Sequence, residues 1–186
     1  MGRRPTGRAR GGRAGSGQKG GFTEAFQAEV VAEIEALVGP GAVDGLDFEA
    51  IETAARRRAL ALAARAVAQR FNADHSDHRG PIVACRCGRP ARYAGRRAKT
   101  FQSALGALTL DRAYYHCEAC DAGFCPRDRA LGVQASSLSP AVTRMVGRVG
   151  AMVSFVEGST LMQELAAVPV DPKQVERTAE ALGREI

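Results

Sequence analysis

The sequence predicts an α+β fold that is mostly helical, in which a small β-hairpin module separates two helical regions. Alanine, arginine and glycine dominate the 186 residues and aromatic residues make up only 5%, a composition that favours Ala-rich helices over a large β-sandwich. Apolar residues recur at helical spacing within residues 21–79 and 138–186. Between them, residues 80–132 combine short runs of β-forming residues, frequent glycines and all five cysteines.

Residues 1–20 contain six basic residues, no acid and almost no large apolar residue, which predicts a disordered basic tail. The whole chain has a net charge of +6, so the residues after the tail are formally neutral. We therefore expect a polyanionic partner that is contacted mainly through the tail. No secretory signal or membrane span is recognisable, which predicts a cytoplasmic, nucleoid-associated protein with reduced thiols and no membrane partner.

Two helices are predicted within residues 21–79. The first spans residues 23–38, begins at Thr23 as its N-cap and ends at the Gly-Pro-Gly sequence of residues 39–41. The second spans about residues 48–72 and carries two neighbouring apolar stripes that are lined mainly by alanine. This wide face packs either on the first helix or on a second copy of the chain, so the two helices together form a candidate homodimer surface.

The module of residues 80–132 is predicted to contain a β-hairpin. Residues 100–104 and 108–115 are rich in β-forming side chains and are joined near Gly106. A hairpin of this kind brings residues 116–120, which directly follow its second strand, to a fixed place in the fold.

Two close pairs of cysteines flank this hairpin, namely Cys85 with Cys87 and Cys117 with Cys120. Zn²⁺ prefers four soft ligands in a tetrahedron, and two such pairs brought together by strands supply them at little entropic cost. The second pair has the usual C-x-x-C spacing. The first pair is one residue shorter, but Gly88 directly after it suits a tight turn of positive φ. We therefore predict a zinc-ribbon-like module in which these four thiols bind a structural Zn²⁺.

Other assignments of the cysteines stay open. His116 or Cys125 could replace one of the four ligands, and the five cysteines could also be small buried thiols without a metal. A redox-active C-x-x-C fits less well, because no βαβ pattern surrounds it.

A run of basic residues follows the first cysteine pair, with no acid between Cys85 and Lys99. Part of its charge would offset the thiolates, and the rest would face solvent and bind phosphates. From this run we assign Arg96, Arg97 and Lys99 to DNA contacts.

The chain is predicted to become helical again after the module. Ser139, Ser154 and Asp171 each have the character of an N-cap, and the second of these helices would run through Val168 until Pro169 ends it. The last two helices are separated by only a few residues and match a helix-turn-helix.

The last helix would expose Lys173, Gln174 and Arg177 near its N-terminus, where recognition helices contact base edges and phosphates. We assign these three residues to DNA contacts. The alternative is a helical hairpin that serves only as a scaffold, since such hairpins are common in proteins that bind no DNA.

Several short motifs lie in a fixed order along residues 80–186. They are Gly95-Arg96-Arg97 with Lys99-Thr100, Arg112-Ala113-Tyr114-Tyr115-His116-Cys117, Gly123-Phe124-Cys125-Pro126-Arg127-Asp128, Leu131-Gly132 and Leu138-Ser139-Pro140. In these motifs the chain resembles the N-terminal half of ISKra-type insertion-sequence transposases, and the helices from residue 23 onward are similar more loosely. The resemblance implies a zinc-ribbon-like module and a helix-turn-helix-like segment that together recognise the transposon ends, which are double-stranded DNA.

The four paired cysteines match the presumed zinc ligands of this family, and Cys125 receives no role from the resemblance. Family members look like DDE-type enzymes with a downstream RNase H-like domain, whose carboxylates hold two divalent metals for strand cleavage. The sequence reaches Ile186 without such a domain, and no trio of carboxylates can be assembled from its acids. We therefore expect a truncated or separately encoded fragment that binds DNA and catalyses nothing by itself.

Two functions of other classes are also open. The neutral body and the alanine-lined face would suit a zinc-stabilised regulator that binds protein rather than DNA. A metal-dependent enzyme would need an open coordination position, for which Asp74, His75, Asp77 and His78 form a local cluster. Polar residues also collect in solvated loops after helix ends, which is the simpler interpretation of that cluster.

Overall fold

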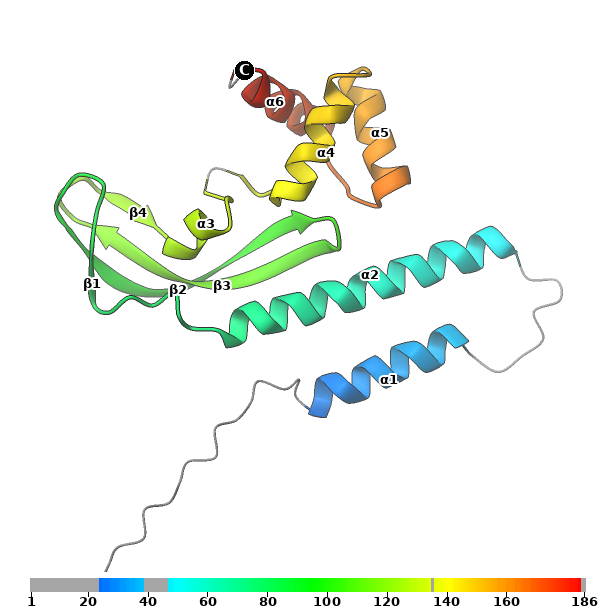
Figure 1. The fold of residues 1–186 in the computed structure, drawn as a ribbon, viewed down its shortest axis with the longest axis horizontal. Helices are drawn as coiled ribbons and strands as arrows, with labels where there is room; N and C mark the ends of the chain where they lie inside the picture. Colours follow the sequence, from blue (N-terminus) through cyan, green and yellow to red (C-terminus); the bar gives the residue numbers. More distant parts are fainter. Residues whose placement is uncertain (1–23, 39–46, 135, 185–186) are drawn as a thin grey trace, which may run out of the picture.

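The computed structural model describes residues 24–38, 47–134 and 136–184, and the basic tail, Thr23 and residues 39–41 therefore lie outside it. Within the described residues, six helices accompany one four-stranded antiparallel sheet of order β1-β2-β3-β4 (Figure 1). This confirms the α+β class with a majority of helix. None of the described helices combines the length and the apolar character needed to cross a membrane.

The centre of the fold is a long antiparallel ribbon of β2 (Pro90–Ser103) and β3 (Gly106–Cys117). The expected hairpin is present, but its first strand begins ten residues before residue 100 and takes in the basic run. These residues have few β-branched side chains, and they form a strand because they pair with β3 from Arg92 onward. The register shifts between Tyr93 and Arg96, where Gly95 has a φ of 94° and forms a bulge.

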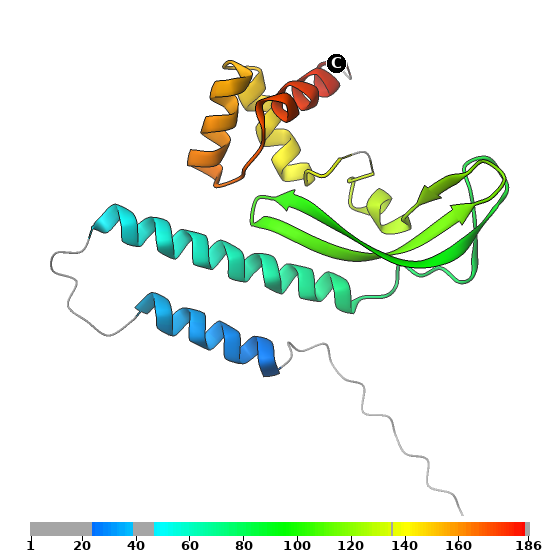
Figure 2. The ribbon, with the colours of Figure 1, turned by 180° about the vertical axis from the view of Figure 1, so that it is seen from behind.

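Two short strands widen the ribbon at the end opposite its turn. β1 (Ile82–Ala84) pairs with the start of β2, and β4 (Ala122–Phe124) pairs with the end of β3. Figure 2 shows that this end of the sheet projects away from the C-terminal helices. The cysteines lie in the connections of these short strands.

The long helix α2 (Phe48–Ala73) lies beside the ribbon and covers the part of the β3 edge that β4 leaves free (Figure 1). The Asn72 side chain accepts a hydrogen bond from the Asp111 N–H at 2.8 Å and donates one to the Thr109 carbonyl at 3.1 Å. It thereby occupies the backbone groups that another strand would otherwise pair with. The ring of Phe71 packs on a core cluster of the sheet formed by Phe101, Leu110 and Val133.

The buried carboxylate of Asp77 links the segment after α2 to the sheet. It accepts hydrogen bonds from the Ala113 N–H at 2.7 Å and from Arg96 at 3.1 Å, and it lies 3.3 Å from the guanidinium of Arg127. Burial would raise the pKa of Asp77, but these three partners lower it below its ordinary value. Arg127 also donates to the carbonyl of Phe71, at the last turn of α2.

The short helix α1 (Glu24–Val38) packs on the side of α2 that faces away from the sheet (Figure 1). Arg65 of α2 lies 3.2 Å from Glu29 and 3.3 Å from Glu33 of α1. Phe26 is buried, whereas Ile34 of the same helix is 50% exposed. The contact between the two helices therefore covers only part of their apolar surface.

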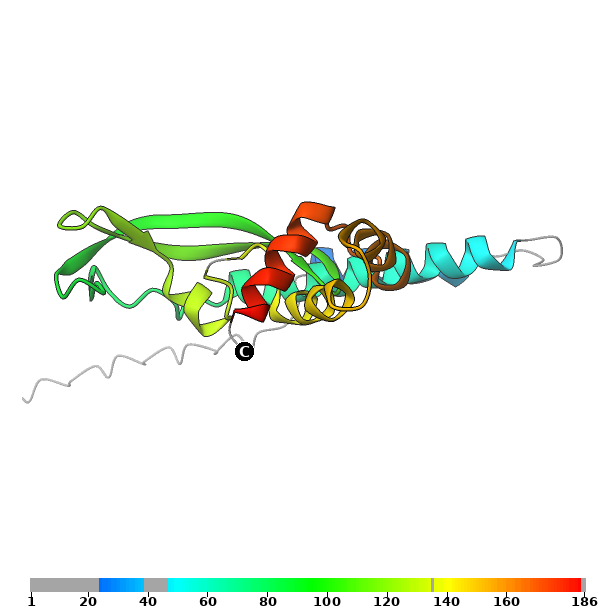
Figure 3. The ribbon, with the colours of Figure 1, turned by 90° about the horizontal axis from the view of Figure 1, so that it is seen from above.

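The three C-terminal helices α4 (Pro140–Gly150), α5 (Phe155–Ala166) and α6 (Pro172–Gly183) pack together near the turn of the ribbon (Figure 3). The expected N-caps Ser139, Ser154 and Asp171 each accept a backbone hydrogen bond. The buried core of this three-helix unit consists of Leu138, Val142, Val146, Met162, Val168, Val170 and Val175. Its first helix is attached to the sheet through Gln102, whose backbone bonds with those of Ser137 and Ser139.

The expected end of α5 was wrong by two residues. The helix ends at Ala166, because Ala167 adopts a left-handed conformation with a φ of 55° and its N–H bonds back to the last turn. Val168 thus leaves the helix and enters the core, where it is fully buried. Pro169 follows this stop and does not cause it.

Replacing Asp77 with alanine should lower the free energy of unfolding by about 3 kcal/mol, because two guanidinium groups and a buried N–H lose their shared acceptor. Urea unfolding followed by circular dichroism measures the effect. Glu164→Ala is the matched control, since Glu164 is an exposed acid of α5 and its loss should change stability by about 0.5 kcal/mol or less. Equal unfolding midpoints for the two variants would contradict the role of Asp77.

Candidate metal centre

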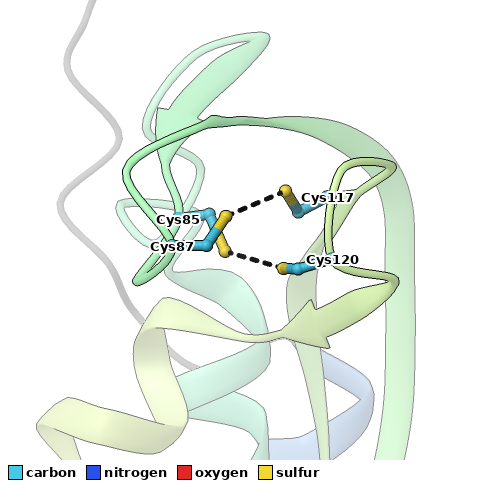
Figure 4. A group of neighbouring side chains, drawn as sticks. All are labelled: Cys85, Cys87, Cys117 and Cys120. Atoms are coloured by element: carbon cyan, nitrogen blue, oxygen red, sulfur yellow. Dashed lines mark hydrogen bonds between the residues drawn. The ribbon is translucent and has the colours of Figure 1, made fainter.

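The thiols of Cys85, Cys87, Cys117 and Cys120 converge at the end of the ribbon, and their four sulfurs lie within 4.8 Å of one another. The Cys85 and Cys120 sulfurs are 3.6 Å apart, and those of Cys87 and Cys117 are 3.7 Å apart (Figure 4). Metal–sulfur bonds of about 2.3 Å in a regular tetrahedron place sulfurs about 3.8 Å apart. The chemistry and the spacing of these four cysteines therefore fit a metal ion.

The backbone explains why the shorter first pair still forms one half of this centre. Gly88 has a φ of 80°, as its position after the pair predicted, and its N–H bonds to the Cys85 carbonyl at 3.0 Å. The Cys85 N–H bonds to the Arg89 carbonyl at 2.9 Å and closes the turn. In the second pair Asp121 takes the left-handed position with a φ of 54°.

The four thiols influence one another's ionisation. A hydrogen bond from the Cys87 N–H lowers the pKa of Cys85 to about 7. At Cys120 the N–H of Ala122 lowers the pKa, but hydrogen bonds with the other three thiols outweigh it and raise the pKa to about 12. The thiol of Cys85 therefore ionises readily and that of Cys120 resists ionisation, because thiolates this close repel each other. A metal cation would allow all four to ionise together.

The other candidate ligands do not join this group. Cys125 is buried beside the short helix α3 (Pro126–Ala130), and burial raises the pKa of its thiol. The Nε2 of His116 bonds with Asp121 at 2.9 Å. The ring of His78 contacts Tyr93 edge-on, and Asp77 belongs to the contacts that hold α2 on the sheet. Among the described residues, the four cysteines form the sole group with metal-ligand geometry.

Positive charge is concentrated in the module that carries the cysteines. Residues 80–132 contain nine basic and four acidic residues, so the body of the protein is neutral only on average. Three of those acids have partners inside the protein, as Asp111 pairs with Arg96, Asp121 with His116 and Asp128 with Arg112. Within residues 79–132, the exposed arginines without an ion pair to a described acid are Arg79, Arg86, Arg89, Arg92, Arg97 and Arg129.

The three basic residues assigned to DNA contacts from the β2 sequence have different environments. The guanidinium of Arg96 is bound by Asp77 and Asp111 within the fold. The ammonium of Lys99 donates to the Ser136 carbonyl at 2.9 Å. Arg97 is exposed, and its guanidinium lies 3.6 Å from the centre of the Tyr114 ring. Of the three, Arg97 is the side chain best placed to meet a ligand.

The three residues assigned on the last helix lie in the first two turns of α6. Lys173 and Arg177 are exposed, and Gln174 is half-buried. The N–H of Gln174 bonds to its N-cap Asp171 at 2.9 Å. The three-helix unit thus leaves two of the three side chains accessible.

Sequence reasoning missed Arg79 and Arg129, which flank the cysteine centre from segments 50 residues apart. The sequence contained one signal of a basic surface that includes Arg79, because no acid occurs between His78 and Leu110.

Comparisons with family models, curated proteins and solved structures give no significant match.

The protein should bind one metal ion per chain, and Cys117→Ser or Cys120→Ser should abolish binding and unfold the strands of residues 80–132. A structural metal contributes on the order of 10 kcal/mol to such a module. Elemental analysis and circular dichroism measure both effects. Cys125→Ser is the control, because its thiol lies outside the cluster and the metal should stay. Metal-free wild-type protein, prepared without a chelator, would rule out the site.

Proposed function

We propose that the chain is a zinc-stabilised protein that binds double-stranded DNA through the positively charged surface of residues 80–132. The observation that carries the proposal is the set of exposed, unpaired arginines around the four cysteines. Four thiolates in a closed tetrahedral set favour Zn²⁺, which needs no open coordination position in a structural role. Clustered arginines without acidic partners bind phosphates.

The two ends of the fold differ in net charge. Residues 133–186 contain five basic and six acidic residues, so the three-helix unit has little net attraction for a polyanion. The sheet therefore supplies most of the phosphate contacts, together with the basic tail. Lys173 and Arg177 on α6 supply fewer contacts, which could read base edges in the major groove.

The resemblance to ISKra-type transposases supports double-stranded transposon ends as the DNA partner. We propose that the chain contributes DNA recognition to transposition and leaves strand cleavage to a separate domain. Cleavage of the DDE type needs a cluster of carboxylates that hold divalent metals. The described residues contain no such cluster of three acids.

The double variant Arg89→Ala/Arg92→Ala should weaken duplex binding and reduce the slope of log K against log salt by about 1.8, if each arginine contacts one phosphate. Fluorescence anisotropy with a labelled duplex at several salt concentrations gives the slope. Arg144→Ala/Arg148→Ala removes two exposed arginines from α4 and should change the slope little. Equal effects of the two variants would show that the sheet has no special role.

A second candidate function is protein interaction, and exposed apolar side chains favour it. Val31 and Ile34 of α1 are at least half exposed, as is Phe48 of α2. The helices are also complementary in charge, because α1 contains four glutamates and no base, whereas α2 contains five arginines and two glutamates. A second copy related by a two-fold axis would cover the exposed apolar side chains of α1, while the contact between α1 and α2 of each chain stays in place.

The wild-type protein should therefore elute as a dimer, and Val31→Glu/Ile34→Glu should convert it to a monomer. Size-exclusion chromatography with light scattering gives the mass. Val156→Glu serves as the control, because Val156 is an exposed apolar residue of α5 outside the two helices. A wild-type monomer, or dissociation by the control variant, would contradict the helical dimer.

A further inference from the structure

A groove of about 980 Å³ lies beside the cysteine centre, between β1, β3, β4 and α3. Four of the unpaired arginines line it, namely Arg79, Arg86, Arg97 and Arg129. Asp128 is the only acid among the residues that line it. A concave surface with this excess of guanidinium groups attracts phosphates more strongly than an open surface does.

The contact of Arg97 with Tyr114 depends on a glycine in β4. A Cβ atom on Gly123 would clash with the Tyr114 hydroxyl, so a larger residue there would displace this ring. Tyr114 lies over Gly123 and supports the guanidinium of Arg97 on the wall of the groove. The side chain of Arg97 is therefore positioned before any ligand arrives.

Inside the groove, the ion pair of Arg112 and Asp128 has unused hydrogen-bonding groups. Nη1 of Arg112 donates to Oδ2 of Asp128, and both residues are buried. The Nε–H of Arg112 and the Oδ1 of Asp128 find no hydrogen-bond partner in the described part of the chain. Buried polar atoms of this kind are rare and costly when nothing satisfies them. This ion pair thus has one unused donor and one unused acceptor, both closed to solvent in this structure.

A free donor beside a free acceptor matches the edge of a nucleobase. Arginine commonly donates to base acceptors and aspartate accepts from base amino groups. Because Arg112 is only 5% exposed, a base stacked and paired within a duplex could not reach it. An unstacked base from a single strand could enter the groove while its phosphates contact the arginines.

We propose that this groove binds a single strand of DNA, with one base at Arg112 and Asp128 and the backbone at Arg97 and Arg129. The proposal deepens the proposed function and rests on it for the nature of the polyanion. It adds a second mode of DNA binding, in which the unpaired strand uses the groove and the duplex uses the wider basic surface.

The test uses the full metal-loaded chain and three labelled probes: oligodeoxycytidine, the same strand without bases, and a duplex. Anisotropy should show the complete strand binding about tenfold more tightly than the abasic strand, because only the former contacts Arg112 and Asp128. Arg97→Ala/Arg129→Ala should weaken binding of the complete strand about tenfold. Arg89→Ala/Arg92→Ala is the matched control, since neither residue lines the groove, and it should weaken duplex binding more than single-strand binding.

Arg112→Lys keeps the positive charge and removes the Nε donor, so the preference for the complete strand should disappear. Metal content and circular dichroism check the fold of this variant. If it does not fold, the affinities of wild-type protein for the complete and the abasic strand still test the proposal. Equal affinity of wild-type protein for the complete and abasic strands would overturn the proposal. If the wild-type protein still binds the duplex in that case, the proposed function stands. If it binds neither the single strand nor the duplex, both the groove proposal and the proposed function are wrong.

Discussion

The four thiols at one end of the β2–β3 ribbon impose the constraint on which the rest of the structure depends. A two-stranded ribbon in water is marginally stable, and this one is held at three places along its length. The three-helix unit holds the turn, and Asp77 holds α2 along the free edge of β3. At the far end the ribbon is held by short strands, by a small core around Tyr115 and by the cysteines, whose four close thiols oppose one another's ionisation. Binding of a metal ion by these thiols would therefore be coupled to the folding of that end.

The charge distribution follows from how the fold uses its acids. Asp77 and Asp111 bind Arg96, and Asp128 binds Arg112, so the acids nearest the ribbon stabilise buried arginines. Arg127 is likewise buried and paired with Asp77, whereas Arg86, Arg89, Arg92, Arg97 and Arg129 are exposed and have no ion pair to a described acid. The buried ion pairs and the positively charged surface thus arise from the same imbalance between basic and acidic residues. A surface of this kind binds DNA more weakly at high salt, whatever its sequence preference.

Local chemistry could be predicted from the sequence, and long-range partners could not. Ser139 as an N-cap and the paired cysteines as one centre follow from short spacings, and both agree with the structure. The structural role of Arg96 depends on Asp77, which precedes it by 19 residues on another element, and no local pattern reveals such a contact. The left-handed Ala167 also had no signal, because glycine is the residue expected at a helix end. The groove combines segments that only the folded sheet brings together.

The most direct measurement of the central claim joins the metal to DNA binding. A labelled duplex is bound by the protein, a zinc-selective chelator is added, and anisotropy and circular dichroism are recorded before and after Zn²⁺ is restored. We expect strand structure and DNA affinity to fall together and to return together, while the signal of the helices persists. DNA affinity that stays unchanged after the metal and the strand structure are lost would contradict the account, because binding would not need the metal-held arginine surface.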